Sequence, residues 1–132
     1  MWILSPTGGF LSAVQHNTDP SSLVVRSRVQ GDLAELSAIS HAPITGGKRN
    51  TDYPWRVIVP RSIFTAYLGE LAQRITYLNF KNEVAKHEIG GVGGKDRALE
   101  YSRVWQSLLD LEDLDPNGRH VSKRPYGTSL DW

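Results

Sequence analysis

Apolar and polar residues alternate in short runs over the first sixty positions, a pattern typical of strands that bury one face. Trp2–Leu4 and Phe10–Gln15 flank the turn sequence SPTGG, which predicts a hairpin. Leu23–Val29 (LVVRSRV) and Pro54–Val59 (PWRVIV) are the clearest strands. The pattern therefore predicts a sheet built from the N-terminal half of the chain.

Elsewhere apolar residues recur every three or four positions, the period of a helix with one buried face. The predicted helices are Asp32–Ile39, Ile63–Ile75, a helix within Tyr77–Glu88, and Arg97–Leu111. The expected buried stripes are Ile63, Tyr67, Leu71 and Ile75 in the second helix, and Leu99, Val104, Trp105 and Leu108 in the last. Ser62 and Asp96 are placed to cap the helices that follow them.

Strands clustered early and helices clustered late predict an α+β fold, with a mostly antiparallel sheet, helices packed on one face, C-terminal helices and an extended tail. The strand and helix order between residues 23 and 75 also permits one parallel pair. Residues 1–112 are expected to form a single α+β domain. Residues 113–132 contain Pro and Gly without an apolar period, which predicts the tail.

Charge and cysteine content narrow the class of protein. Lys and Arg number 15 against 14 Asp and Glu, a net charge of +1, whereas a binder of long nucleic acid usually has a basic excess. The chain has no cysteine, which excludes disulfides and thiolate ligands. Its four histidines are dispersed, so neither a metal nor a cofactor is expected. No apolar run reaches the roughly 20 residues that span a bilayer, and we expect a cytoplasmic protein without a membrane partner.

The stretch DYPWRVIVPRSIFTAYLGELAQRITYLNFKNEV contains the residues best suited to a ligand. Arginine offers planar, bidentate donors, an aromatic face can stack on a base, and a helix start favours phosphate. These groups suit a nucleotide, and they do not form a set that activates water or a nucleophile. The candidate binding residues are Arg56 on the strand, Asn79, Phe80, Lys81 and Asn82 at the corner after the second helix, and Arg103 on the last helix.

Each candidate also has a plainer reading. Arg56 reads equally as a solvated strand charge, and Phe80 as a core residue. Asn79 is as well placed to cap a helix as to read a base edge. Arg26 and Arg28 share one strand face and read as solvated charges.

The sequence GGVGGKD predicts a flexible break before the last helix. It lacks the first Gly and the Ser or Thr of a phosphate-binding P-loop. A mobile connection is one reading of this loop. The other is a lid over a ligand, with Lys95 and Arg97 supplying its charge.

Several segments in this order resemble one protein family. They are the opening MW followed by GF, then VRSRVQGDL, DYPWRVIVPR, YLNFKNEV and YSRVWQSLL, spread over roughly residues 1–111. Together they resemble the phage-encoded Thoeris anti-defence proteins of the first type, small sponges that sequester cyclic ADP-ribose signals.

The resemblance implies binding without catalysis. The expected ligand is glycocyclic ADP-ribose, with a second site for cyclic oligonucleotides in some members, and the expected assembly is a homodimer or a hexamer. Arg56 matches the strand arginine of the ligand pocket and Phe80 the aromatic that stacks on adenine, while Asn82 and Arg103 are looser matches. The four tryptophans also favour an interface.

Three functions remain open on the sequence. The first is a nonenzymatic sponge for cyclic nucleotides, acting in the cytoplasm of an infected bacterium. The second is an enzyme that processes nucleotides. The third is a protein-binding inhibitor of a host factor, for which Trp55, Tyr126 and Trp132 would supply aromatic contacts.

Overall fold

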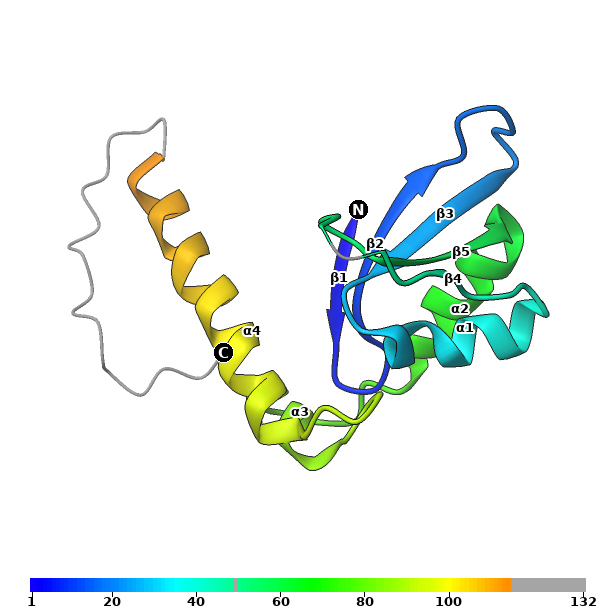
Figure 1. Ribbon diagram of the computed structural model, residues 1–132. Coiled ribbons are helices and arrows are strands. Elements are labelled where there is room, and N and C mark those ends of the chain that lie inside the picture. The colour runs from blue at the N-terminus through cyan, green and yellow to red at the C-terminus, as the bar shows by residue number, and fades with distance from the viewer. Residues whose placement is uncertain (49, 115–132) are drawn as a thin grey trace.

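A five-stranded antiparallel sheet organises the N-terminal half of the chain in the computed structural model, which describes residues 1–48 and 50–114. The strand order is β1-β2-β3-β5-β4 (Figure 1). The strands are β1 (Trp2–Ser5), β2 (Gly9–Gln15), β3 (Ser22–Ser27), β4 (Thr45–Gly46) and β5 (Trp55–Pro60). All neighbouring strands in this sheet are antiparallel. The predicted α+β class and N-terminal hairpin are therefore confirmed, and the parallel pair that the order permitted does not form.

One helix lies between β3 and β4, and the other three follow the last strand. They are α1 (Ala34–Ser40), α2 (Arg61–Gln73), α3 (Phe80–Lys86) and α4 (Gly94–Leu108), with 3-10 turns η1 (Gln30–Leu33) and η2 (Leu109–Leu114). The η2 turn covers the first two residues of the segment predicted as a tail, and residues 115–132 lie outside the described residues. No described helix has the length and apolar character needed to cross a bilayer.

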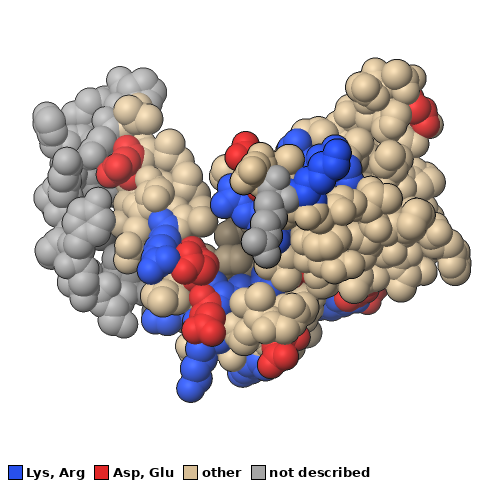
Figure 2. Space-filling view, in the orientation of Figure 1, with Lys and Arg blue, Asp and Glu red and all other residues tan. Residues whose placement is uncertain are grey.

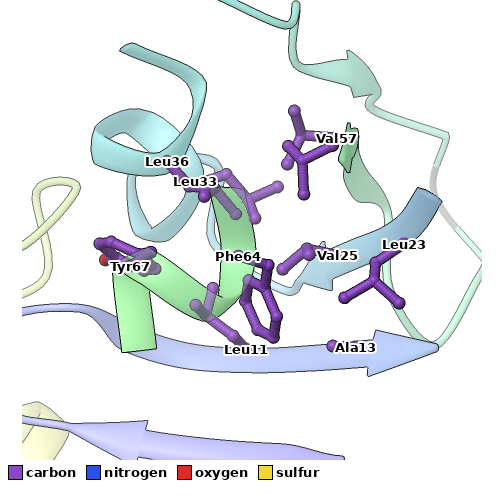
Figure 3. Packing of buried hydrophobic residues seen from close by; sticks show 10 residues of the cluster. Leu11, Ala13, Leu23, Val25, Leu33, Leu36, Val57, Phe64 and Tyr67 are labelled. Atoms are coloured by element: carbon purple, nitrogen blue, oxygen red, sulfur yellow. The ribbon is translucent and has the colours of Figure 1, made fainter. Parts of the chain in front are cut away.

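The main core lies between one face of the sheet and helices α1 and α2 (Figure 3). Leu11, Val25 and Val57 come from three adjacent strands and are at most 1% exposed, as their alternation with polar residues requires. Phe64 and Tyr67 of α2 pack on them. The expected stripe of α2 was therefore only partly correct. The deepest residue beside Tyr67 is Phe64, while Ile75 lies beyond the end of the helix and is exposed.

A second, smaller cluster joins α3 and α4 to the first hairpin. Val84, Ala98 and Tyr101 are buried there, and Leu4 and Phe10 of the hairpin pack against them. The predicted stripe of the last helix is wrong in this respect. Leu99 and Leu108 are more than half exposed, and the buried face contains Arg97, Ala98 and Tyr101 instead. The apolar spacing did not indicate this face, because one of the buried residues on the face is an arginine.

The expected caps of α2 and α4 are also wrong. Helix α2 begins at Arg61, directly after Pro60, and has no side-chain cap, so Ser62 lies inside its first turn. Helix α4 begins at Gly94, which places Asp96 inside the first turn as well. Gly94 is required there because a Cβ atom would come within 2.4–2.6 Å of three carbonyl oxygens at the end of α3.

A buried ion pair between Asp32 and Arg97 holds α4 against the sheet. Arg97 donates to the two carboxylate oxygens at 2.7 and 2.9 Å, and the backbone N–H of Phe10 donates to the same carboxylate at 3.0 Å. The two side chains are 1% and 5% exposed. Burial opposes the charge of Arg97, but the hydrogen bonds to Asp32 and Tyr101 outweigh it and raise the pKa of the guanidinium. Arg97 therefore remains charged at neutral pH.

Replacing Arg97 with Met should strongly destabilise the protein, because it leaves the Asp32 carboxylate buried without its partner. The expected loss in the free energy of unfolding is about 3–5 kcal/mol, measured by urea denaturation. Arg103→Met on the same helix is the control, since its ion pair with Glu100 is exposed. The double variant Asp32→Asn/Arg97→Met should recover part of the loss. A loss as small as that of the control would show that the pair is not structurally important.

The hydroxyl of Tyr67 is the other unusual polar group of the core. Tyr67 is 1% exposed, and its hydroxyl has no hydrogen-bond partner among the described residues. Burial, reinforced by the negative charge of Glu35, raises the pKa of Tyr67 to about 12. An unfolded tyrosine ionises near pH 10, so the folded state retains this proton more strongly than the unfolded state does.

Tyr67→Phe should leave stability unchanged or raise it by up to about 1 kcal/mol at neutral pH, because it removes an unsatisfied buried hydroxyl. Between pH 10 and 12 the wild type should lose stability as pH rises, since only its unfolded state readily releases the proton. The variant should lose less over the same interval. Parallel thermal denaturation of both proteins from pH 8 to 12 tests this, and a destabilised variant at pH 8 would contradict it.

Candidate functional site

The face of the sheet opposite α1 and α2 carries three arginines. The antiparallel register places Arg26 of β3 directly opposite Arg56 of β5, and Arg28 follows at the end of β3. Arg26 donates to the hydroxyl of Ser12 on β2 at 2.8 Å. In the described part of the chain, none of the three arginines forms an ion pair with a carboxylate. Their charges therefore remain available to an anion.

Tyr53, just before β5, holds two of these arginines together. The guanidinium carbon of Arg26 lies 4.7 Å from the centre of the Tyr53 ring, and that of Arg28 lies 5.5 Å from it. The ring of Phe10 is 6.2 Å from that of Tyr53. Cation–π contacts of this kind position a guanidinium without neutralising it. The aromatic ring thus brings like charges close together.

A hollow of about 490 Å³ lies beside Arg26, Tyr53 and Arg56. Three of its lining residues are basic or aromatic groups from the sheet, and an acidic residue, Asp52, lies at its rim. We call it the arginine hollow. Its lining residues are Trp2, Arg26, Thr51, Asp52, Tyr53 and Arg56.

A second cavity of about 370 Å³ adjoins it, between the sheet and α4. Its walls are mainly apolar and aromatic, and we call it the aromatic cleft. In Figure 2 this depression lies between the body that contains the sheet and the α4 side, with basic side chains beside it. Trp2 lines both cavities, and its ring meets that of Phe10 edge to face at 5.6 Å. The lining includes Trp2, Leu4, Phe10, Arg28, Glu100, Tyr101 and Val104.

Of the residues predicted from sequence, Arg56 lines the arginine hollow and Arg103 lies near the aromatic cleft. Arg103 donates to the carboxylate of Glu100, which is part of the cleft wall, at 2.6 Å. Neither finding tests ligand binding. Arg56 thus lines a cavity itself, whereas Arg103 lines neither cavity and contacts the cleft wall through Glu100.

The predicted corner of residues 79–82 lines neither cavity. Asn79 caps α3, and its side-chain oxygen accepts from the backbone N–H of Asn82 at 2.8 Å. Lys81 and Asn82 are exposed in the first turn. Phe80 packs into the second cluster, where its ring stacks on Tyr101 with centres 6.0 Å apart and planes 6° apart. Phe80 therefore reaches the aromatic cleft only through Tyr101.

The residues of the suggested charged lid lie in a tight turn and in the first turns of α4. The backbone of Ile89 and Val92 closes a tight turn with two hydrogen bonds, and Gly90 lies directly against Gly31. A Cβ atom on Gly31 would come 2.1 Å from the Gly90 Cα atom. Lys95 lies in the first turn of α4, and Arg97 is fixed in the buried ion pair. Arg97 is therefore held in the core, whereas the side chain of Lys95 is exposed.

Sequence reasoning missed most of the site. Arg26 and Arg28 were correctly placed on one strand face but interpreted as solvated charges, and Tyr53 was not considered. The one available indication was the pattern of two arginines on one strand and a third on another. Only the strand register shows that Arg26 and Arg56 are neighbours.

Comparison of the chain with known protein families, curated proteins and solved structures gave no match. Among the described residues, no three His, Asp or Glu side chains are grouped so that they could hold a metal ion. The geometry of the two cavities is therefore the observation from which a function can be inferred.

The unneutralised arginines should respond to salt and to anions. Arg56 is exposed, and Arg56→Ala should raise the melting temperature slightly in low salt by relieving repulsion between like charges, a gain that salt screens. Inorganic pyrophosphate should stabilise the wild type more than the variant. Thermal-shift curves at two ionic strengths measure both effects. Equal stabilisation of the two proteins by pyrophosphate would show that Arg56 does not contact the anion.

Proposed function

We propose that the protein binds a cyclic nucleotide signal of the cyclic ADP-ribose type and releases it chemically unchanged. The observation that carries this proposal is the contact between the arginine hollow and the aromatic cleft through Trp2. Guanidinium groups bind phosphate bidentately, and aromatic walls take up a flat base. A nucleotide provides both groups within the span of adjoining cavities.

The charge of the site supports a small ligand. Arg26 and Arg56 line the hollow with one carboxylate, Asp52, and Arg28 lines the adjoining cleft. The whole chain nevertheless has a net charge of only +1. Positive charge is thus concentrated at one place, which suits a ligand with one or two phosphates better than a long nucleic acid.

The side chains of the cavities favour sequestration over catalysis. Hydrolysis needs a positioned nucleophile, a tuned acid–base pair or a comparable device. The groups that converge here are guanidinium donors and ring faces, and the buried carboxylate of Asp32 is fully engaged by Arg97 and Phe10. In an infected bacterium, binding of this kind would remove a defence signal from the cytoplasm and block the anti-phage response.

The test is a depletion experiment with glycocyclic ADP-ribose and a panel of cyclic oligonucleotides. Protein mixed with a slight excess of ligand should remove a stoichiometric amount, and heat denaturation should return the ligand intact. Turnover beyond one ligand per site, or recovery of a linear product, would favour the nucleotide-processing enzyme. If no nucleotide is bound or shifts the melting temperature, the protein-binding function becomes the better explanation.

Substitutions test whether the ligand binds in the two cavities or at residues 79–82, the corner that the sequence suggested. Arg56→Ala should weaken binding by about 1.5–3 kcal/mol, the value of a charge-assisted hydrogen bond, as measured by calorimetry. Lys81→Ala should bind normally, because Lys81 lines neither cavity. Phe80→Ala should weaken binding through the loss of support for Tyr101. The opposite result, a large effect of Lys81 with none of Arg56, would place the site at the corner.

A further inference from the structure

The wall that α4 contributes to the aromatic cleft contains an accessible carboxylate. Arg97, Glu100, Tyr101 and Val104 line the cleft, and their spacing of three and four residues places them on one face of the helix. Arg97 is engaged by Asp32, and Tyr101 is buried. The side chain of Glu100 is 63% exposed. Of these four residues, Glu100 is therefore the one whose polar group a ligand can reach.

The wall that the sheet contributes has the opposite charge. Arg28 lines the cleft from the end of β3, and Arg26 and Arg56 line the adjoining arginine hollow. The aromatic side chains of Trp2 and Phe10 belong to the same cleft. A ligand in this site thus meets hydrogen-bond donors on the sheet and a hydrogen-bond acceptor on the helix.

Arg103 fixes the orientation of the Glu100 carboxylate. Its Nη1 atom donates to Oε1 of Glu100 at 2.6 Å. Both side chains are well exposed, so this pair contributes little to stability. Among the described residues, no donor is bound to the second oxygen, Oε2. Arg103 therefore holds the carboxylate by one oxygen and leaves the other able to accept a hydrogen bond from a ligand.

We propose that Glu100 determines which base the aromatic cleft accepts, by taking a hydrogen bond from an exocyclic amino group of that base. The inference rests on the proposed function, in which the arginines hold the phosphates and the base enters the cleft. A base that carries an amino group there presents a donor to Glu100, and carboxylates are suitable acceptors for such groups. A base that carries a carbonyl group instead brings its oxygen against a carboxylate.

The charge of Glu100 makes this contact selective. A carboxylate in a site for an anionic ligand repels that ligand, and the repulsion lowers the affinity for every nucleotide. A hydrogen bond from the base offsets the repulsion, but only when the base carries a donor at this position. Glu100 therefore acts mainly by discriminating against the wrong base, and the arginines supply most of the affinity.

The experiment compares two ligands that differ in one group. Glycocyclic ADP-ribose carries the amino group of adenine, and its deaminated form carries a carbonyl oxygen in the same place. Calorimetry measures the affinity of both ligands for the wild type, Glu100→Gln and Glu70→Gln. Glutamine keeps an acceptor oxygen and adds a donor, so it can pair with either base. Glu70 is the matched control, because it is 60% exposed, pairs with Arg74 and lines neither cavity.

We expect the wild type and Glu70→Gln to prefer the amino form by about tenfold, the lower end of the range for a hydrogen bond to a charged group. Glu100→Gln should bind the two forms with nearly equal affinity. Its affinity for inorganic pyrophosphate should be unchanged or slightly higher, since the arginines hold this anion. That measurement also shows that the variant is folded.

Two results would overturn the inference while leaving the proposed function in place. One is equal binding of the two forms by the wild type. The other is a Glu100→Gln variant that keeps the wild-type preference, even if it binds both forms more weakly, because Glu100 would then shape the cleft without contacting the base. Binding of neither form by the wild type would overturn both this inference and the proposed function.

Discussion

The ion pair between Asp32 and Arg97 is the interaction on which the arrangement of the molecule depends. It joins residues 65 positions apart in sequence and connects three segments, because Asp32 also accepts from the backbone of Phe10. Burial of two charges is unfavourable unless each is well paired, so α4 has one favourable position against the hairpin. That position creates the aromatic cleft. A buried ion pair can therefore determine where a cavity forms.

The arginine hollow solves the opposite electrostatic problem. Here the like charges of Arg26 and Arg56 are held close together, with Arg28 beside Arg26, and no carboxylate of the described residues neutralises them by an ion pair. The sheet fixes their backbone positions, while Tyr53 and Ser12 orient the side chains without cancelling their charge. The repulsion that remains is an unfavourable term for the folded protein. An anion bound beside these arginines would relieve that repulsion.

Local patterns were enough to predict β1, β2, β3 and β5, the helices and the α+β class, since alternation and helical spacing reflect burial on one face, but β4 lies in a segment interpreted as a loop. They failed where a decisive contact joins distant segments. Arg97 could not be recognised as a core residue without knowledge of Asp32, and the proximity of Arg26 and Arg56 depends on the β3–β5 register. Phe80 was correctly described as a possible core residue, and Asn79 as a helix cap. The structural interpretations of Phe80 and Asn79 are therefore confirmed. The interpretation of Arg26 and Arg28 as solvated charges did not anticipate their contacts with Tyr53.

The β3–β5 register also links the binding surface to cooperative unfolding. A slip of one residue would turn Arg56 into the core and Val57 toward solvent, so the register cannot change while the core remains intact. The backbone hydrogen bonds between β3 and β5 near Arg26 and Arg56 therefore belong to the most protected part of the sheet. Those at the far end of α4 have fewer packed neighbours and open with much less free energy. In hydrogen exchange, the C-terminal end of α4 should therefore exchange faster than the sheet, in which Arg26 and Arg56 stay in place.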